Sequence, residues 1–226
     1  MREKTPQPVV NNKELIPLAH YMEEYRNADP AAMAERTGSG WDPLRRVISL
    51  SFLGHAYEIT WPDFDILKAD GEENRNEENG DVERGDWSPL LSTNQARILV
   101  ARFLLEGIRL ENPGKFLTYR EVPWGEVYNR QFTGRCITRL AFSYGNRLDE
   151  YRKKMEKLGA VPVKESDAGY EIEIFPEYKI RFLIWAGDDE FPPSAQILFS
   201  ENFAGGFHAE DLVVAAEVII GALKHI

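Results

Sequence analysis

The spacing of apolar residues changes along the chain, from the three- and four-residue repeat of helices to the two-residue repeat of strands. These changes mark the expected elements. Near the N-terminus apolar residues recur at spacings of three and four, which predicts a helix that begins at Asn11 or Asn12. Its apolar positions are Leu15, Leu18, Met22 and Tyr25. Pro30 then opens a second short helix that ends in glycine, so the two helices occupy about 12–37.

A β-hairpin follows these helices. Residues 46–53 and 56–61 partly alternate between apolar and polar side chains, as half-buried strands do. The pair Gly54-His55 between them fits a two-residue type II′ turn, because glycine accepts a positive φ at the first central position. Residues from about 68 to 91 are rich in acids and almost free of apolar side chains, which predicts a solvated loop.

Three helical regions occupy the middle of the chain. Ser92 begins a capping-box pattern, and the segment after it is apolar around most of its circumference, so we expect a central helix. The aromatic-rich residues 117–145 indicate two short helices separated by Gly134. Asn146 is then expected to cap a helix that Gly159 ends.

The last third of the chain predicts strands followed by a buried helix. Apolar runs at 169–175, 178–185 and 195–200 read as strands, the first two joined by a tight turn at Pro176-Glu177. The final segment is small and apolar on most sides. The order of helices, hairpin, helices, antiparallel strands and helix favours a single α+β domain over 1–226, with a mostly antiparallel sheet packed by helices on one face.

Composition narrows the classes of function. The 226 residues are 43% apolar and carry a formal net charge of −10. This acidity argues against binding nucleic acid, since phosphate contacts need clustered Lys and Arg, and against docking on anionic membranes. No apolar run is long enough to span a bilayer, and the N-terminus lacks the apolar segment of a secretory signal. We therefore expect a cytoplasmic protein.

The sequence contains one cysteine, Cys136. One cysteine cannot form an intrachain disulfide or, within one chain, a cysteine-based zinc or iron–sulfur site. Arg135 and Arg139 flank it, but no histidine accompanies it in sequence, so we interpret it as a buried structural thiol. No cofactor and no metal site is predicted.

Motifs for the common chemistries are absent: there is no phosphate loop, dinucleotide fingerprint, nucleophile elbow or zinc-protease pair. The acidic stretch lacks the ligand order of a calcium loop. His20, His55 and His225 are interpreted as structural or exposed. His208 is a better candidate, because Gly205 and Gly206 precede it and a helix N-terminus follows, an arrangement that can hold an anion. No basic residue lies near it in sequence.

Two aromatic segments, 119–132 and 185–191, carry the remaining candidates. Each combines aromatic rings with a few charged groups, a composition that can line a small-molecule pocket but that also occurs in cores. The candidate binding residues are Tyr119, Arg120, Trp124, Tyr128, Trp185, Asp188, Asp189, Glu190 and His208.

The stretch WAGDDEFPP, residues 185–193, predicts a polar turn. Asp188 is expected to accept hydrogen bonds from backbone N–H groups, as Asp does in turns. Asp189 and Glu190 are then candidates for ion pairs, with Arg120, Arg130 or Arg135 as the nearest cations. Two prolines remove backbone donors, so strand pairing should resume near Ala195.

The same two segments resemble an uncharacterised bacterial and archaeal family of unknown function, found mainly in strict anaerobes. The matching positions are Trp124, Gly125, Tyr128, Trp185, Asp189, Glu190, Phe191, Pro192, Leu198 and Phe199. The resemblance covers roughly the C-terminal three-quarters of the chain and implies no activity and no catalytic residues. Some relatives carry an added iron–sulfur domain of the type seen in corrinoid methyl-transfer proteins, whose cluster one cysteine cannot hold.

We predict a binding or accessory module for an unknown small molecule or protein, with its pocket or surface between 119–132 and 185–191. One alternative is a hydrolase or transferase that uses Asp188, Asp189 or Glu190 as a general base or as ligands for Mg²⁺ or Mn²⁺. That chemistry needs two of these carboxylates to converge with a third polar group. The other alternative is a structural protein whose apolar final helix continues into an oligomer interface.

Overall fold

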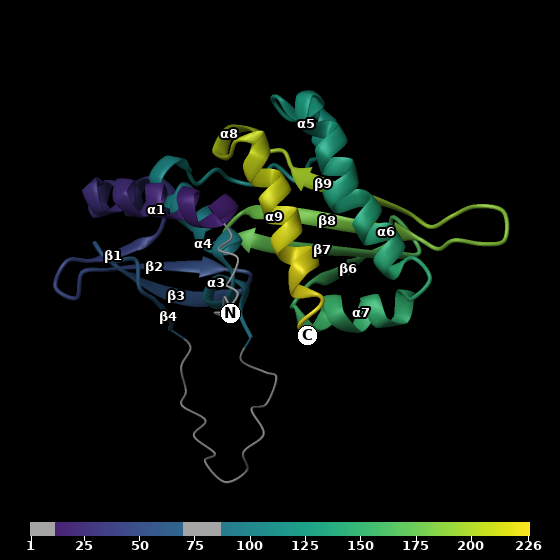
Figure 1. Ribbon diagram of the computed structural model, residues 1–226, viewed down its shortest axis with the longest axis horizontal. Coiled ribbons are helices and arrows are strands. Elements are labelled where there is room, and N and C mark those ends of the chain that lie inside the picture. Colours follow the sequence, from purple (N-terminus) through teal and green to yellow (C-terminus); the bar gives the residue numbers. More distant parts are fainter. Residues whose placement is uncertain (1–11, 70–86) are drawn as a thin grey trace, which may run out of the picture.

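The computed structural model describes residues 12–69 and 87–226, and its architecture is α+β, as the sequence predicts (Figure 1). The strands form two antiparallel sheets, one of four strands and one of five, where a single sheet was expected. The short edge strands escaped the sequence pattern because three residues are too few to show alternation. Among the described residues no helix has the length and apolar character that a membrane span needs.

The two N-terminal helices form where the sequence places them. They are α1 (Asn12–Asn27) and α2 (Pro30–Thr37). Asp29 caps α2 by accepting a hydrogen bond from the Ala31 N–H at 3.0 Å, and Gly38 ends it at φ 69°. The prediction of these helices is confirmed.

The first sheet has the strand order β1-β2-β3-β4. Its strands are β1 (Gly40–Asp42), β2 (Val47–Phe52), β3 (His55–Thr60) and β4 (Ile66–Lys68). The hairpin is confirmed, but its turn is Leu53-Gly54, with both φ angles positive at 50° and 75°, which is a type I′ arrangement. The predicted Gly54-His55 turn is wrong because Leu53 is buried and donates its N–H to Ile174 O in the other sheet at 3.0 Å.

The boundaries of the predicted acidic loop are more ordered than expected. Its residues 70–86 lie outside the described residues. On one side Lys68 ends β4, and on the other side Ser88 is buried and hydrogen-bonds the hydroxyl of Tyr57. The short helix α3 (Pro89–Ser92) follows directly.

Helix α4 (Asn94–Glu106) is central, as its apolar circumference predicts. It contacts α1, α2 and α9. Thr93 caps it by accepting a hydrogen bond from the Ala96 N–H at 3.3 Å, so the predicted cap at Ser92 is displaced by one residue because α3 takes up Ser92. At the other end the guanidinium of Arg36 donates to the carbonyls of Leu104, Leu105 and Gly107 at 2.6 to 2.8 Å.

The aromatic-rich region forms one long helix, whereas two helices broken at Gly134 were predicted. Before this helix the chain forms the strand β5 (Phe116–Thr118) and the 3₁₀ turn η1 (Tyr119–Glu121). The helix itself consists of α5 (Gly125–Phe132), a π-helical turn η2 (Thr133–Thr138) and α6 (Arg139–Tyr144). The backbone stays right-handed helical from Phe132 through Arg139. The extra residue of the π turn absorbs the irregularity that Gly134 introduces, so the helix does not break.

The next helix and the second sheet agree largely with the pattern. Helix α7 (Leu148–Lys157) ends before Gly159 at φ 82°, as predicted, but Arg147, not Asn146, is its N-terminal cap residue. The sheet, in the order β5-β9-β8-β7-β6, adds β6 (Val161–Val163), β7 (Ala168–Phe175), β8 (Tyr178–Trp185) and β9 (Ser194–Ser200). The tight turn at Pro176-Glu177 is confirmed.

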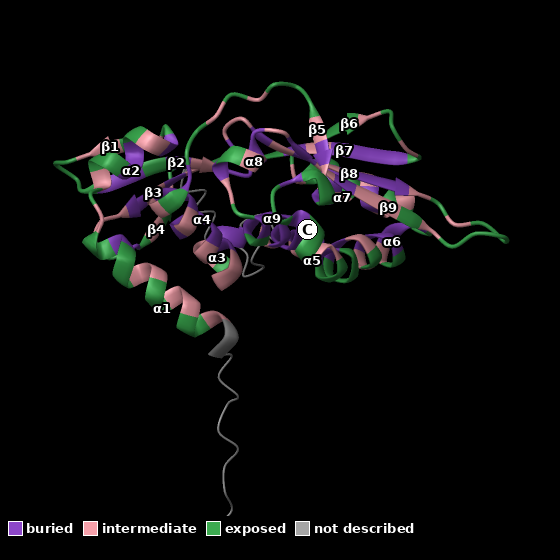
Figure 2. Cartoon of the chain, turned by 90° about the horizontal axis from the view of Figure 1, so that it is seen from above, coloured by how far each residue is buried: buried purple, intermediate pink, exposed green. Residues whose placement is uncertain are grey.

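Helices cover one face of the five-stranded sheet (Figure 2). They include α8 (Phe203–Gly206) and α9 (Ala209–Ala222), of which α9 is buried along almost its whole length. The alternate residues of β8 that face the helices are buried. On the other face Arg181 pairs with Glu171 at 2.9 Å and with Glu165 at 2.6 Å, as befits a solvated antiparallel surface.

An aromatic cluster joins the two sheets. Phe103 of α4 stacks on Phe175 of β7, with ring centroids 4.2 Å apart, and on Phe207 at 5.4 Å. Phe52 at the end of β2 packs edge-on against Phe175 at 5.2 Å. One continuous hydrophobic core therefore runs from the first sheet through α4 to the second sheet.

The variant Arg36→Met tests how α4 ends. It keeps the aliphatic stem but leaves three carbonyls at the C-terminal end of α4 without their charged donor, so the free energy of unfolding should fall by about 2 kcal/mol in urea denaturation. Arg120→Met is the matched control, because Arg120 is exposed and pairs with Glu126 only across the surface. That control should leave the midpoint unchanged, and equal losses in both variants would contradict the capping role.

Candidate functional site

The turn before α5 is fastened to the N-terminus of α9. Tyr119 is buried, donates its hydroxyl hydrogen to Ala209 O at 3.0 Å and stacks on Phe132 with centroids 4.1 Å apart. Burial raises the pKa of Tyr119 to about 12, so the phenol is a neutral donor at physiological pH. Glu121 closes the turn from the other side by accepting hydrogen bonds from the N–H and hydroxyl of Thr118 at 2.7 and 2.8 Å.

This turn presents Trp124 to solvent. Trp124 has φ 63° and is 77% exposed, directly between Pro123 and Gly125. A Cβ atom at Gly125 would lie 1.8 Å from Tyr119 O, so the close approach of the chain here requires glycine. The backbone therefore holds the indole outward although the ring gains little from packing.

His208 lies opposite Trp124 at the start of α9. Its N–H donates to Asp211 Oδ2 at 3.1 Å, and its side chain is 69% exposed with Nε2 3.4 Å from Glu106 Oε2. The preceding glycines pack closely, since a Cβ at Gly206 would lie 2.0 Å from the hydroxyl of Tyr178. His208 therefore lies at the junction between α8 and α9.

Arg102 of α4 organises the floor beside His208. Its Nε lies 2.6 Å from Asp211 Oδ1, Nη2 donates to Asp211 Oδ2 at 3.2 Å, and Nη1 donates to the Tyr21 hydroxyl at 2.6 Å. Burial raises the pKa of Asp211, while Arg102 and the His208 N–H oppose this by favouring the carboxylate. This buried ion pair, with one hydrogen bond from Nη2 to Asp211, ties the two helices together.

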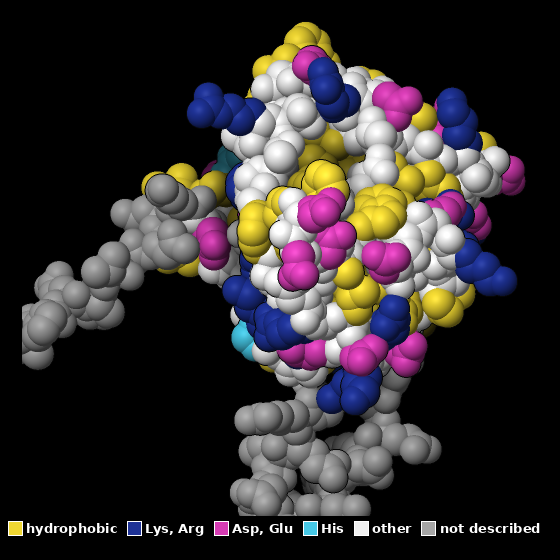
Figure 3. Space-filling view, turned by 90° about the vertical axis from the view of Figure 1, so that its right-hand side faces the viewer, with side chains coloured by type: hydrophobic (Ala, Val, Ile, Leu, Met, Phe, Trp, Pro, Cys, Tyr) yellow, Lys and Arg dark blue, Asp and Glu magenta, His cyan; other side chains and the backbone are white. Residues whose placement is uncertain are grey.

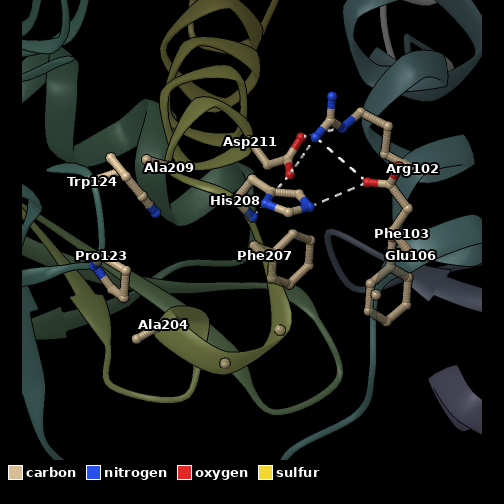
Figure 4. Close-up of a pocket in the computed structure, with 13 residues that line it drawn as sticks. Arg102, Phe103, Glu106, Pro123, Trp124, Ala204, Phe207, His208, Ala209 and Asp211 are labelled. Atoms are coloured by element: carbon tan, nitrogen blue, oxygen red, sulfur yellow. Dashed lines mark hydrogen bonds and ion pairs between the residues drawn. The ribbon is translucent and has the colours of Figure 1, made fainter. Parts of the chain in front are cut away.

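These groups surround a pocket of about 270 Å³ (Figure 4). Trp124 and Pro123 stand on one side of it and His208 and Phe207 on the other, with Glu106 and Arg102 beyond His208. Its lining residues are Arg102, Phe103, Glu106, Gly107, Pro123, Trp124, Ala204, Gly205, Gly206, Phe207, His208, Ala209 and Asp211. The pocket combines an exposed indole, a histidine and an acid with backbone from a glycine pair.

Four of the predicted site residues meet around the N-terminus of α9. Trp124 and His208 line the pocket, Tyr119 bonds to Ala209, and Tyr128 hydrogen-bonds Glu210, which raises the pKa of that phenol. Arg120 turns away to the surface, where it pairs with Glu126 at 2.7 and 3.0 Å.

The structure separates Trp185 and the acidic turn from this group. Trp124 precedes the long helix 125–144, whereas Pro193 of the β8–β9 connection packs against Gly145 at its other end. At about 1.5 Å per residue the helix sets these points about 30 Å apart. The two segments therefore do not form one pocket, and the β8–β9 connection projects from the opposite end of the molecule (Figure 1).

The acidic turn itself is partly as predicted. Asp188 Oδ1 accepts hydrogen bonds from the N–H groups of Glu190 and Phe191 at 2.9 and 2.7 Å, which lower the pKa of this carboxyl. Strand pairing resumes at Ser194, one residue before the predicted position. That end of the molecule shows acidic side chains among hydrophobic ones (Figure 3).

The predicted ion pairs of Asp189 and Glu190 are wrong for the described part of the chain. Both acids are exposed and neither pairs with an arginine there. Arg120 pairs with Glu126, and Arg135 pairs with the buried Glu217 of α9. Arg120 and Arg135 thus pair with acids of α5 and α9, not with those of the distant turn.

Three pocket residues were missed in the sequence: Arg102, Glu106 and Asp211. The expectation that no basic residue lies near His208 is wrong, because folding brings Arg102 from more than a hundred positions away in the chain. A signal was present, since Arg102 stands between apolar residues in the middle of α4 and a buried arginine needs a partner.

Cys136, His20 and His225 each contact neighbouring residues within the fold. Cys136 is buried against Val213, and burial raises the pKa of its thiol to about 12, which makes it unreactive. His20 lies 3.3 Å from Glu24 on α1, and His225 stacks on Trp87 with centroids 4.4 Å apart. Within 12–69 and 87–226, no group of three or more His, Cys, Asp or Glu residues is placed to hold a metal ion.

The chain belongs to the family described as a domain of unknown function, DUF3786, whose model matches residues 29–222. The match is wider than the C-terminal three-quarters indicated by the motifs and takes in α2, the first sheet and every pocket residue. Neither a curated protein nor a solved structure matches the chain.

The pair Arg102–Asp211 should behave as one unit in a double-mutant cycle. Arg102→Met and Asp211→Asn each leave a buried charge unpaired, so each should lower the free energy of unfolding by about 3 kcal/mol in urea melts. The double variant should lose clearly less than the sum, with a coupling of about 1–3 kcal/mol. Additive losses would contradict the coupling of Arg102 to Asp211, and the exposed pair Arg120–Glu126 serves as the additive control.

Variants of the acidic turn should separate its three carboxylates. Asp189→Asn and Glu190→Gln should melt like the parent at pH 7, because both side chains are solvated. Asp188→Ala should speed amide exchange at Glu190 and Phe191. Since the folded pKa of Asp188 is lowered, its bonds are present at neutral pH and are lost as the pH falls through that pKa. Equal exchange in all three variants would contradict this assignment.

Proposed function

We propose that this protein is a binding module for a small organic molecule, held in the pocket between Trp124 and His208. The observation that carries the proposal is the exposed indole of Trp124, fixed at a positive φ beside a pocket that three separate segments of the chain build. Conformations of this kind persist where neighbours determine them, and they concentrate at ligand sites.

The dimensions and lining of the pocket suit a small ligand. Its volume of about 270 Å³ lies near the lower end of the range for ligand sites, which corresponds to a fragment-sized molecule. Aromatic and glycine surfaces provide contact area, and His208 and Glu106 provide a few directed polar groups. The Arg102–Asp211 pair and the Tyr119–Ala209 hydrogen bond hold the walls in place before a ligand arrives, which reduces the entropy that binding costs.

The two alternative functions find less support. For a carboxylate-dependent hydrolase or transferase, the three acids of the β8–β9 connection would have to converge with another polar group. Asp188 instead bonds its own turn, and Asp189 and Glu190 face solvent. For an oligomerising protein, the motivation was the apolar surface of α9, and the chain itself buries that surface.

We also infer a cytoplasmic location, with neither nucleic acid nor membrane as a partner. The net charge of −10 supports this, because it disfavours phosphate-rich surfaces. The origin in strict anaerobes and the occurrence of relatives with an iron–sulfur domain stay predictions of the motif resemblance, as does the protein partner that an accessory module would serve.

Fragment screening tests the proposed pocket. In ligand-observed NMR of the full chain, we expect aromatic fragments to bind and Trp124→Ala to remove their binding, because the indole supplies one wall. Phe142→Ala is the control, since Phe142 is similarly exposed at 70% on the same long helix but does not line the pocket. Fragments that bind Trp124→Ala as well as the parent would overturn the proposal.

A further inference from the structure

Arg102, the arginine of the pocket, is already paired with an acid. Two contacts join Arg102 to Asp211, a third joins it to the hydroxyl of Tyr21, and the arginine side chain is only 17% exposed. Its guanidinium also lies over the Tyr21 ring at 5.3 Å. An anionic ligand would therefore have to break a buried ion pair to reach Arg102, and the neighbouring acids Glu106 and Glu210 would repel it.

The acid in the pocket, by contrast, remains open. Glu106 is 44% exposed at the last residue of α4, with Oε2 3.6 Å from Arg102 Nη2 and 3.4 Å from His208 Nε2. Both separations exceed the usual length of a charge-assisted hydrogen bond. The carboxylate thus retains capacity to accept hydrogen bonds from a donor in the pocket.

An aromatic surface suited to a cation stands across the pocket from this acid. The indole of Trp124 has the strongest quadrupole among aromatic side chains, and cations bind its face. Pro123 and Ala204 add apolar surface around it, with no charged side chain among the lining residues on that side (Figure 4). The pocket therefore offers one carboxylate and one indole to a ligand that carries positive charge on an apolar frame.

We infer that the ligand is a small organic amine bound as its ammonium ion, with the nitrogen directed to Glu106 and the hydrocarbon or ring against Trp124. This inference rests on the proposed binding function and specifies its ligand class. A primary ammonium donates three hydrogen bonds, so it satisfies the free lone pairs of Glu106, while the indole face packs against the hydrocarbon or ring.

Three probes that share a phenol ring with a two-carbon side chain and carry end groups of different charge test the inference: tyramine, the neutral alcohol tyrosol, and the acid 4-hydroxyphenylpropionate. By isothermal titration calorimetry of the full chain at pH 7, tyramine should bind about tenfold more tightly than tyrosol, and the acid should bind most weakly. Glu106→Gln should abolish the preference for tyramine over tyrosol. The matched control is Glu165→Gln, which removes the same charge from a glutamate of equal exposure, 45%, paired with Arg181 on the distant sheet face.

The outcomes separate this inference from the proposed function. If the three probes bind equally, or if Glu165→Gln weakens tyramine as much as Glu106→Gln does, the ammonium assignment is wrong while the pocket stands. Tighter binding of the acid would also overturn it. If no probe binds but aromatic fragments still bind in a way that depends on Trp124, the proposed pocket is supported and the assignment of an amine ligand is wrong. If aromatic fragments bind the parent and Trp124→Ala equally well, both the proposed pocket and the amine assignment are wrong.

Discussion

The mutual packing of Phe103, Phe175 and Phe207 is the constraint on which the pocket depends. It joins α4 to the five-stranded sheet on one side and to the α8–α9 connection on the other. Because successive residues of a helix point in different directions, fixing Phe103 in the core also fixes Arg102 and Glu106, one position before it and three after. Both then reach the N-terminus of α9, and the buried Arg102–Asp211 pair forms where the aromatic packing has already brought the two helices together.

Much of the secondary structure could be predicted because its signals are local. A glycine after α7, the proline that opens α2 and the Pro176-Glu177 turn each act through their own backbone. The errors arose where a distant contact decided a local choice. Leu53 enters the core and bonds Ile174, so the hairpin turn shifts by one residue, and no pattern within the hairpin records that contact.

The predictions for the site show the same contrast between local and distant contacts. Asp188 was predicted because an aspartate in a turn bonds to the next N–H groups, whereas the partners of Asp189 and Glu190 were wrong because ion pairs depend on tertiary proximity. Trp124 and His208 were both singled out for their composition. Only the fold shows that they face one pocket, and that Glu106 joins them there with Oε2 3.4 Å from His208 Nε2.

Trp124 differs in its energetics from Leu53 and Phe64, two other non-glycine residues at positive φ. Such a conformation costs about 1 kcal/mol or more. Leu53 and Phe64 also have positive φ, but their side chains are buried, so core packing offsets the cost. The indole of Trp124 is 77% exposed and obtains little of that compensation, and the conformation depends instead on Gly125 and on the bond from Tyr119 to α9. This arrangement, in which neighbouring residues hold an exposed indole in solvent, supports the proposal that Trp124 contacts another molecule.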